Sequence, residues 1–265
     1  MNWYVEGSVM TTLVVGANGA TGRLVVEQLL DQGETVRAIV RSLDSFPVSL
    51  KQHNQLTITE ASLLDMSNAE LLTQVQGCNA VASCLGHNLT LKGMFGHPKR
   101  LVSDGVRRIC DAIEKTIPDA PVKFILMNTT GNKNKLAGET VSLAQSVVVG
   151  LIRKLLPPHA DNEIAAAYLQ SNFGTNQKVI EWTAVRPDSL IDEESVTEYY
   201  VHPSPIRSAI FDAGKTSRVN VAYFMSQLII NDSTWEKWKY QMPVVYNASY
   251  SHIMVPEPKN ERTNV

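Results

Sequence analysis

Residues 12–42, TLVVGANGATGRLVVEQLLDQGETVRAIVRS, contain the pattern that decides the fold. An apolar run over residues 11–15 leads into a turn with glycines at positions 16, 19 and 22. A helical segment over residues 23–31 follows, Gly33 ends it, and a second apolar run covers residues 35–40. A strand, a glycine turn, a helix and a second strand in this order are typical of the first unit of a parallel α/β sheet.

The same alternation continues to residue 187. We predict further strands at 56–59, 80–84, 122–127 and 182–185, and helices at 67–75, 99–115 and 160–170. Such an order predicts a Rossmann-type doubly wound parallel sheet with right-handed crossovers. We expect one domain over residues 1–265, with a core at 10–187, a small C-terminal substrate-side segment at 188–255 and a polar tail at 256–265.

The glycine turn has the composition of a phosphate-binding turn. Gly16 lets the chain leave the strand sharply, Gly19 leaves room for a pyrophosphate, and Gly22 lets the helix pack close to the sheet. The start of the helix then offers free N–H groups and a positive dipole end. A tight turn without a ligand is the alternative interpretation. We expect dinucleotide contacts from Gly16, Asn18, Gly19, Ala20, Thr21, Gly22 and Arg23.

The end of the second strand bears on the choice of dinucleotide. NAD-binding chains usually place an acidic residue there for the ribose 2′-hydroxyl, whereas this chain has Arg41 followed by Ser42. A guanidinium can pair with a 2′-phosphate in two hydrogen bonds. The sequence therefore favours NADP(H), with a solvated loop charge as the alternative role of Arg41.

Further cofactor contacts are expected after the third and fourth strands. Asp65 can accept a hydrogen bond from the adenine amino group, and Met66 can pack on the ring. Asp65 is equally well placed to cap the helix that follows. Ser83, Leu85 and Gly86 lie where the backbone passes the cofactor ribose.

Three stretches resemble one protein family. Residues 12–42 resemble the opening of the atypical short-chain dehydrogenase/reductase superfamily, in the NAD(P)H-binding, NmrA-like group that includes flavin reductase (biliverdin-IXβ reductase). Residues 181–187, EWTAVRP, resemble the (D/E)WTxxRP strand of this group, and residues 217–222, SRVNVA, resemble its late SRxDVA helix start. The resemblance extends over roughly residues 11–247.

The resemblance has consequences for catalysis. Typical members use a Tyr-x-x-x-Lys pair, but here Tyr168 is followed four residues later by Asn172. The flavin reductase branch also lacks the pair, and Thr130 matches its serine after the fifth strand. We name Asn128, Thr130 and His159 as candidate catalytic residues; a surface loop histidine is the alternative for His159.

Composition excludes several other classes of function. A net charge of −2 without a basic stripe argues against nucleic acid as a partner. Three cysteines without CxxC spacing and six histidines without an HExxH pattern predict no metal site. No segment has the length of a membrane span or the features of a signal peptide.

These observations together predict a cytoplasmic oxidoreductase that acts as a monomer or weak homodimer, with a small molecule as its partner and no membrane or nucleic acid partner. The hypothesis is an NADPH-dependent reductase of a small conjugated, flavin- or quinone-like substrate. The alternative is a non-catalytic regulator that senses the redox state of NADP(H), because the fold alone does not decide between the two.

Overall fold

The structure is a computed structural model that describes residues 9–87, 96–134, 137–139, 148, 150–151, 157–175 and 178–248. Its first unit is β1 (Thr11–Val15), α1 (Ala20–Asp31) and β2 (Thr35–Val40), which confirms the prediction from residues 12–42. The core continues with α2 (Val48–Lys51), β3 (Leu56–Glu60), α3 (Asn68–Val75), β4 (Ala80–Ser83), α5 (Leu101–Thr116), β5 (Val122–Met127), α7 (Pro157–Phe173) and β6 (Ile180–Pro187).

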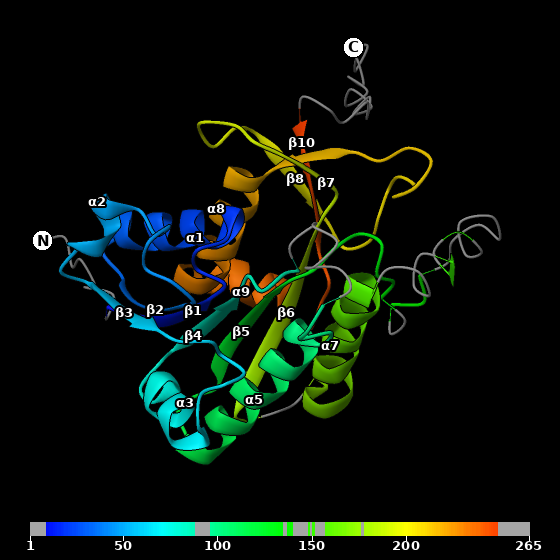
Figure 1. Ribbon diagram of the computed structural model, residues 1–265. Coiled ribbons are helices and arrows are strands. Elements are labelled where there is room, and N and C mark those ends of the chain that lie inside the picture. The colour runs from blue at the N-terminus through cyan, green and yellow to red at the C-terminus, as the bar shows by residue number, and fades with distance from the viewer. Residues whose placement is uncertain are drawn as a thin grey trace, which may run out of the picture.

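Eight strands form one sheet in the order β3-β2-β1-β4-β5-β6-β10-β8 (Figure 1). The seven strands from β3 to β10 pair in parallel, and β8 (Tyr199–His202) runs antiparallel to β10 (Val244–Asn247) at one edge. The strand order reverses between β1 and β4, which both start crossovers from the centre of the sheet. Ligands of doubly wound folds bind at this point, beyond the carboxyl ends of the strands. The Rossmann-type prediction is therefore confirmed.

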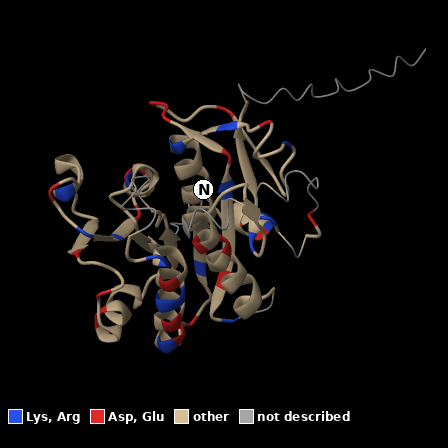
Figure 2. Cartoon of the chain, turned by 45° about the vertical axis from the view of Figure 1, so that its right-hand side comes forward, with Lys and Arg blue, Asp and Glu red and all other residues tan. Residues whose placement is uncertain are grey.

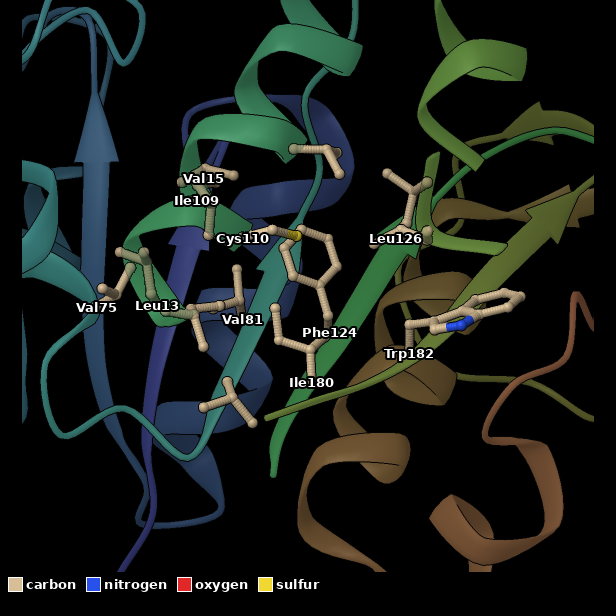
Figure 3. Close-up of a cluster of buried hydrophobic side chains, with 14 of the residues drawn as sticks. Leu13, Val15, Val75, Val81, Ile109, Cys110, Phe124, Leu126, Ile180 and Trp182 are labelled. Carbon is tan, nitrogen blue, oxygen red and sulfur yellow. The ribbon is translucent and has the colours of Figure 1, made fainter. Parts of the chain in front are cut away.

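Helices cover both faces of the sheet, so its central strands are buried on both sides. On β1, Leu13 and Val15 pack in the cluster beneath α3, α5 and α7, whereas Val14 packs in the cluster beneath α1 and α8 (Arg218–Ile230). Figure 3 shows the first cluster, in which Phe124 lies near the centre. Most residues of both clusters come from the apolar runs that predicted the elements, and the second cluster also contains Leu50 of α2, Trp235 and Trp238.

The C-terminal segment joins the main sheet and also adds a small second one. Val244 of β10 pairs with Arg186 of β6. β7 (Ser189–Ile191) and β9 (Lys215–Ser217) form a two-stranded parallel sheet, and α9 (Asp232–Trp238) follows α8. The sequence pattern also predicts a helix at residues 220–230 and a short strand at 244–246, which α8 and β10 confirm, but it indicates none of α2, β7, β8, β9 and α9.

Acidic and basic residues are interspersed over the part of the chain that the structure describes (Figure 2). Within the same part, no helix has the length and apolarity needed to cross a membrane. Among these residues there is also no group of three or more His, Cys, Asp or Glu that could hold a metal ion.

Candidate functional site

Two glycines of the turn between β1 and α1, Gly16 and Gly22, lie where the backbone leaves no room for a side chain. Gly16 has a φ of 73°, and a Cβ there would lie 2.5 Å from the carbonyl oxygen of Cys84. A Cβ at Gly22 would collide with the Gly16 carbonyl oxygen. The first glycine therefore brings the turn against the end of β4, and the third brings α1 against the turn, as the sequence predicted.

The N-terminus of α1 is open to an anion. Gly19 is the N-cap in extended conformation, no side chain caps the helix, and its first turn contains no acidic residue. The first N–H groups of a helix need partners, and a phosphate can supply them. Of the residues expected to act here, Thr21 and Gly22 are buried against the fold, and Ala20 and Arg23 are exposed.

A cleft of about 530 Å³ begins at this turn and extends over the carboxyl ends of β1 to β4. The predicted residues that line it are Gly16, Asn18, Gly19, Arg41, Leu85 and Gly86. Its other walls come from Ser42 and Ser45 after β2, from residues 61–63 after β3, and from Leu101 at the start of α5. The structure thus brings together six of the thirteen predicted cofactor residues in one cleft.

Asn18 connects the glycine turn to the loop after β2. Its Nδ2 donates to Ser45 Oγ at 2.6 Å and approaches the Ser42 carbonyl oxygen at 3.5 Å. This loop begins at Arg41, which is exposed on the cleft wall. Turn and loop are therefore held together at the edge where the sequence expects a ribose phosphate.

Seven predicted cofactor residues are not in the cleft wall: Ala20, Thr21, Gly22 and Arg23 lie at the start of α1, and three others lie after β3 or at the end of β4. Asp65 is exposed, Met66 is buried in the hydrophobic core, and Ser83 is fully buried at the end of β4. The helix cap proposed for Asp65 belongs instead to Ser67, whose Oγ accepts from the Glu70 N–H at 3.2 Å. β3 extends to Glu60, so the residues that reach the cleft after it are 61–63 rather than 65 and 66.

A second, smaller pocket of about 240 Å³ lies over the carboxyl ends of β5 and β6. It is lined by Thr130 and His159, which the sequence named, and by Asp188, which it missed. Thr130 Oγ donates to Asp188 Oδ1 at 3.3 Å, and the Gly214 N–H donates to Oδ2 at 2.8 Å. Burial raises the pKa of Asp188. An acid directly after the RP step of the EWTAVRP motif was the available signal.

Asn128 serves the loop rather than the pocket. Its Nδ2 donates to the Asn162 carbonyl oxygen at 3.1 Å, and its Oδ1 accepts from the Thr129 N–H at 2.8 Å and from Asn132 Nδ2. The side chain is buried and is not part of the pocket wall. These hydrogen bonds hold the chain that carries Thr130.

Tyr168 has the surroundings of a packing residue. Its ring meets Phe173 edge to face at 6.0 Å, and the Arg107 guanidinium lies 5.5 Å from the ring centre. Burial raises the pKa of Tyr168 to about 12, so its phenol is a poor proton donor. Burial likewise raises the pKa of the Cys84 thiol in the cleft wall to about 12, which keeps it un-ionised.

A buried carboxylate connects the cleft to the helices behind it. Asp161 of α7 accepts from the N–H groups of Val102 and Ser103 at 2.7 and 3.0 Å, and its Oδ2 lies 2.9 Å from His87 Nε2. His87 directly follows Gly86 in the cleft wall. This arrangement fixes the start of α5 and the chain after β4.

Fold, glycine turn and cleft together define a dinucleotide-binding protein of the Rossmann type. The sequence profile of the NAD(P)H-binding family matches residues 16–232, so the chain belongs to this family. The matched residues cover most of the stretch over which the sequence resembles NAD(P)H-binding proteins.

Among curated proteins, an uncharacterized chloroplastic protein of Arabidopsis thaliana is 25% identical to this chain over 200 residues. These residues cover 75% of this chain and 66% of the Arabidopsis protein, so the chain spans just under two thirds of that protein's length. A Bacillus halodurans protein described as an NAD-dependent epimerase/dehydratase has a TM-score of 0.65 at 22% identity, covering 90% of this chain and 94% of the other.

Two further solved structures share the fold. The NADP complex of a Veillonella parvula short-chain dehydrogenase/reductase gives a TM-score of 0.64 at 15% identity, covering 91% of this chain and 96% of the other. ChuY, an anaerobillin reductase of Escherichia coli O157:H7, gives a TM-score of 0.63 at 16% identity, covering 92% of this chain and 100% of the other.

Proposed function

We propose that the protein is an NADPH-dependent reductase of a small conjugated molecule of the flavin or quinone type. The observation that carries the proposal is the cleft from the glycine turn to Gly86, with a second pocket beyond it over β5 and β6. The first site has the shape and the open helix N-terminus that a dinucleotide needs. The second site supplies polar groups for a substrate.

NADP(H) fits the residues of the cleft better than NAD(H). None of the described lining residues is acidic, and Arg41, Ser42 and Ser45 offer a cation and two hydroxyl groups after β2. Glu60 lies at the end of β3, but its Oε1 accepts from the Leu43 N–H at 3.0 Å outside the cleft wall. The Veillonella parvula neighbour, crystallised with NADP, supports this assignment.

A reduction that does not use the Tyr-x-x-x-Lys pair suits this chain, which lacks it. When bound, the reduced nicotinamide supplies a hydride. The residues of the chain hold and align the two reactants, and alignment alone can lower a barrier by several kcal/mol. Tyr168 is not placed as the usual proton donor, because burial raises its pKa to about 12. The neighbour ChuY, described as an anaerobillin reductase, supports a reductase.

The test is oxidation of NADPH by the purified chain with a panel of flavins and quinones, FMN and menadione among them. We expect turnover with at least one acceptor and a preference for NADPH over NADH. Failure with every acceptor, together with equal affinities for NADP+ and NADPH, would instead support a non-catalytic redox sensor. Gel filtration and cell fractionation test the expected monomer or weak homodimer and the cytoplasmic location.

Gly19→Asp tests the proposed dinucleotide site by a binding measurement that does not depend on turnover. The backbone of Gly19 has a φ of −74° and a ψ of 159°, which any residue adopts, and Asp is a favourable N-cap. A Cβ there would lie 3.1 Å from the Gly16 carbonyl oxygen, a tight contact that a small shift can relieve. The variant should fold with nearly unchanged stability yet bind NADPH weakly, because its carboxylate occupies the phosphate position. Unchanged binding would contradict the proposed site.

A further inference from the structure

The small pocket brings together chemical groups from three distant elements. Thr130 follows β5, His159 belongs to α7, and Asp188 comes directly after β6. The His159 ring packs against the backbone of Gly131, where a Cβ would lie 3.1 Å from His159 Cε1. The lining of this pocket of about 240 Å³ therefore includes a hydroxyl, an imidazole and a carboxyl group.

The hydrogen bonds of Asp188 suit both of its protonation states. The Gly214 N–H donates to Oδ2 at 2.8 Å, and this oxygen can be the carbonyl oxygen of the protonated acid. Thr130 Oγ lies 3.3 Å from Oδ1. A hydroxyl both donates and accepts, so Thr130 can donate to the carboxylate or accept from the acid. No heavy atom has to move when the proton leaves.

The groups packed around Asp188 leave its carboxyl group easier to protonate than one in water. Burial raises the pKa of Asp188. The hydrogen bonds from Gly214 and Thr130 and the charge of Arg207 lower this pKa, but the effect of burial is larger. Arg207 is paired with Asp212 at 2.6 Å. On the side of β10, burial and the Asp188 charge raise the pKa of Tyr246 to about 12, so this phenol stays neutral. His159 is the other titratable group that lines the pocket.

We propose that Asp188 is the proton donor for the substrate of this reductase and that Thr130 passes the proton on; the inference rests on the proposed function. Asp188 gives the proton at Oδ1 to Thr130 Oγ, and the Thr130 hydroxyl proton goes to an oxygen or ring nitrogen of the acceptor. The reduced nicotinamide supplies the hydride, so the acceptor gains two hydrogens and two electrons and NADP+ remains. Water returns a proton to the Asp188 carboxylate.

Asp188→Asn tests the donor while preserving the structure. Its Oδ1 can accept from the Gly214 N–H and its Nδ2 can donate to Thr130, as in the protonated acid, but it has no proton to release. We expect kcat with the acceptor to fall about 10²-fold or more, with NADPH affinity unchanged. The wild-type kcat should fall as the pH rises and Asp188 loses its proton, and this limb should be absent from the variant.

Three further variants distinguish loss of the proton relay from general damage to the structure. Thr130→Val should lower kcat like Asp188→Asn, and Thr130→Ser should restore it because the hydroxyl returns. Asp192→Asn is the matched control: this carboxylate is exposed on the same segment and pairs with Arg218 at 2.8 Å, so its kcat and pH profile should equal those of the wild type.

Infrared difference spectroscopy gives a readout that does not depend on turnover. The wild-type minus Asp188→Asn spectrum should contain the C=O stretch of a protonated carboxyl group, which disappears over the pH range in which kcat falls. An Asp188→Asn enzyme with wild-type rate and pH profile, or a spectrum without a titrating carboxyl signal, overturns the inference and leaves the reductase standing. A wild-type chain that reduces no acceptor overturns both.

Discussion

Under the proposed function, we expect Arg41 to decide the choice between the two nicotinamide dinucleotides. It lies exposed on the cleft wall at the end of β2, next to Ser42 and close to the Asn18–Ser45 hydrogen bond that fixes the loop. A guanidinium in such a position can bind a phosphate through two charge-assisted hydrogen bonds. The side chain has no comparable interaction to offer a ribose that lacks this phosphate.

Arg41→Glu should therefore weaken NADPH binding by about tenfold or more and leave NADH binding unchanged or improved, because a hydrogen bond to a charged group contributes roughly 1.5–3 kcal/mol. Titration of tryptophan fluorescence with each dinucleotide measures the two affinities. Lys51→Glu, which makes the same charge change at an exposed site outside the cleft wall, should leave both values unchanged. Equal NADPH affinity in Arg41→Glu and the wild type would rule out the role of Arg41.

Residues whose role depends on neighbours in the sequence could be recognised before the structure was known. Gly16, Gly19 and Arg41 act through a turn and a strand end that adjacent residues define. The EWTAVRP motif marks the position of Asp188, which directly follows it, but not its surroundings, since its partners Thr130 and Gly214 come from segments distant in sequence. Its place in a pocket follows from the pairing of strands rather than from a motif.

Among the elements, α5 depends on another helix for its start. Its N-cap, Arg100, makes no side-chain cap hydrogen bond. Asp161 of α7 accepts instead from the Val102 and Ser103 N–H groups and from Ser103 Oγ, and it is buried together with His87. A carboxylate at a helix N-terminus is stabilised by the N–H groups and by the helix dipole. α5 and α7 are thus joined near the cleft.

Asp161→Ala should lower the free energy of unfolding by about 2–3 kcal/mol, since it leaves the first N–H groups of α5 buried without an acceptor. Urea unfolding followed by circular dichroism measures the change as a lower midpoint at constant slope. Asp111→Asn, on the exposed side of the same helix, serves as the control and should stay within about 0.5 kcal/mol of the wild type. A midpoint in Asp161→Ala equal to that of the wild type would contradict the capping role.

The elements that the sequence predicted are those that a local pattern marks. β1, β2 and β5 are short apolar runs, and α5 repeats its apolar residues at helical spacing. β7 and β9 have three residues each and pair across a long connection, Ser189 with Lys215, so no local pattern identifies them. β8 likewise becomes a strand because β10 pairs with it, and Tyr199–His202 are only half buried.

At the scale of the whole molecule, Arg186 joins parts of the chain that are distant in sequence. It is fully buried in β6, and its guanidinium donates to the carbonyl oxygens of Asn132 and Met242 at 2.9 and 2.7 Å. Both carboxylate oxygens of Glu139 accept from it, at 2.7 and 2.8 Å. The arginine of the EWTAVRP motif therefore has a structural role, because it connects β6 to the segments that contain Asn132, Glu139 and Met242. The motif alone did not indicate this role.

The Arg186–Glu139 pair should make stability depend on pH. Burial alone would raise the pKa of Glu139, but the hydrogen bonds and charge of Arg186 and the N–H of Asn134 hold it below its usual 4.5. Because the folded chain binds this proton less readily than the unfolded chain, the stabilisation is complete above pH 4.5 and is lost as the pH falls through the lowered pKa. Glu139→Gln should lose about 3 kcal/mol near neutral pH, since it leaves a buried guanidinium without its counter-charge.

Thermal unfolding between neutral and acid pH tests this expectation. The difference in Tm between wild type and Glu139→Gln should be largest near neutral pH and should shrink as the wild-type carboxylate becomes protonated, because the two chains then differ little in charge. Glu236→Gln breaks the pair with Lys239 on an exposed carboxylate, so its Tm should follow that of the wild type at every pH. A Tm difference for Glu139→Gln that stays constant with pH would mean that packing, and not the buried charge pair, holds the loop after β5 to β6.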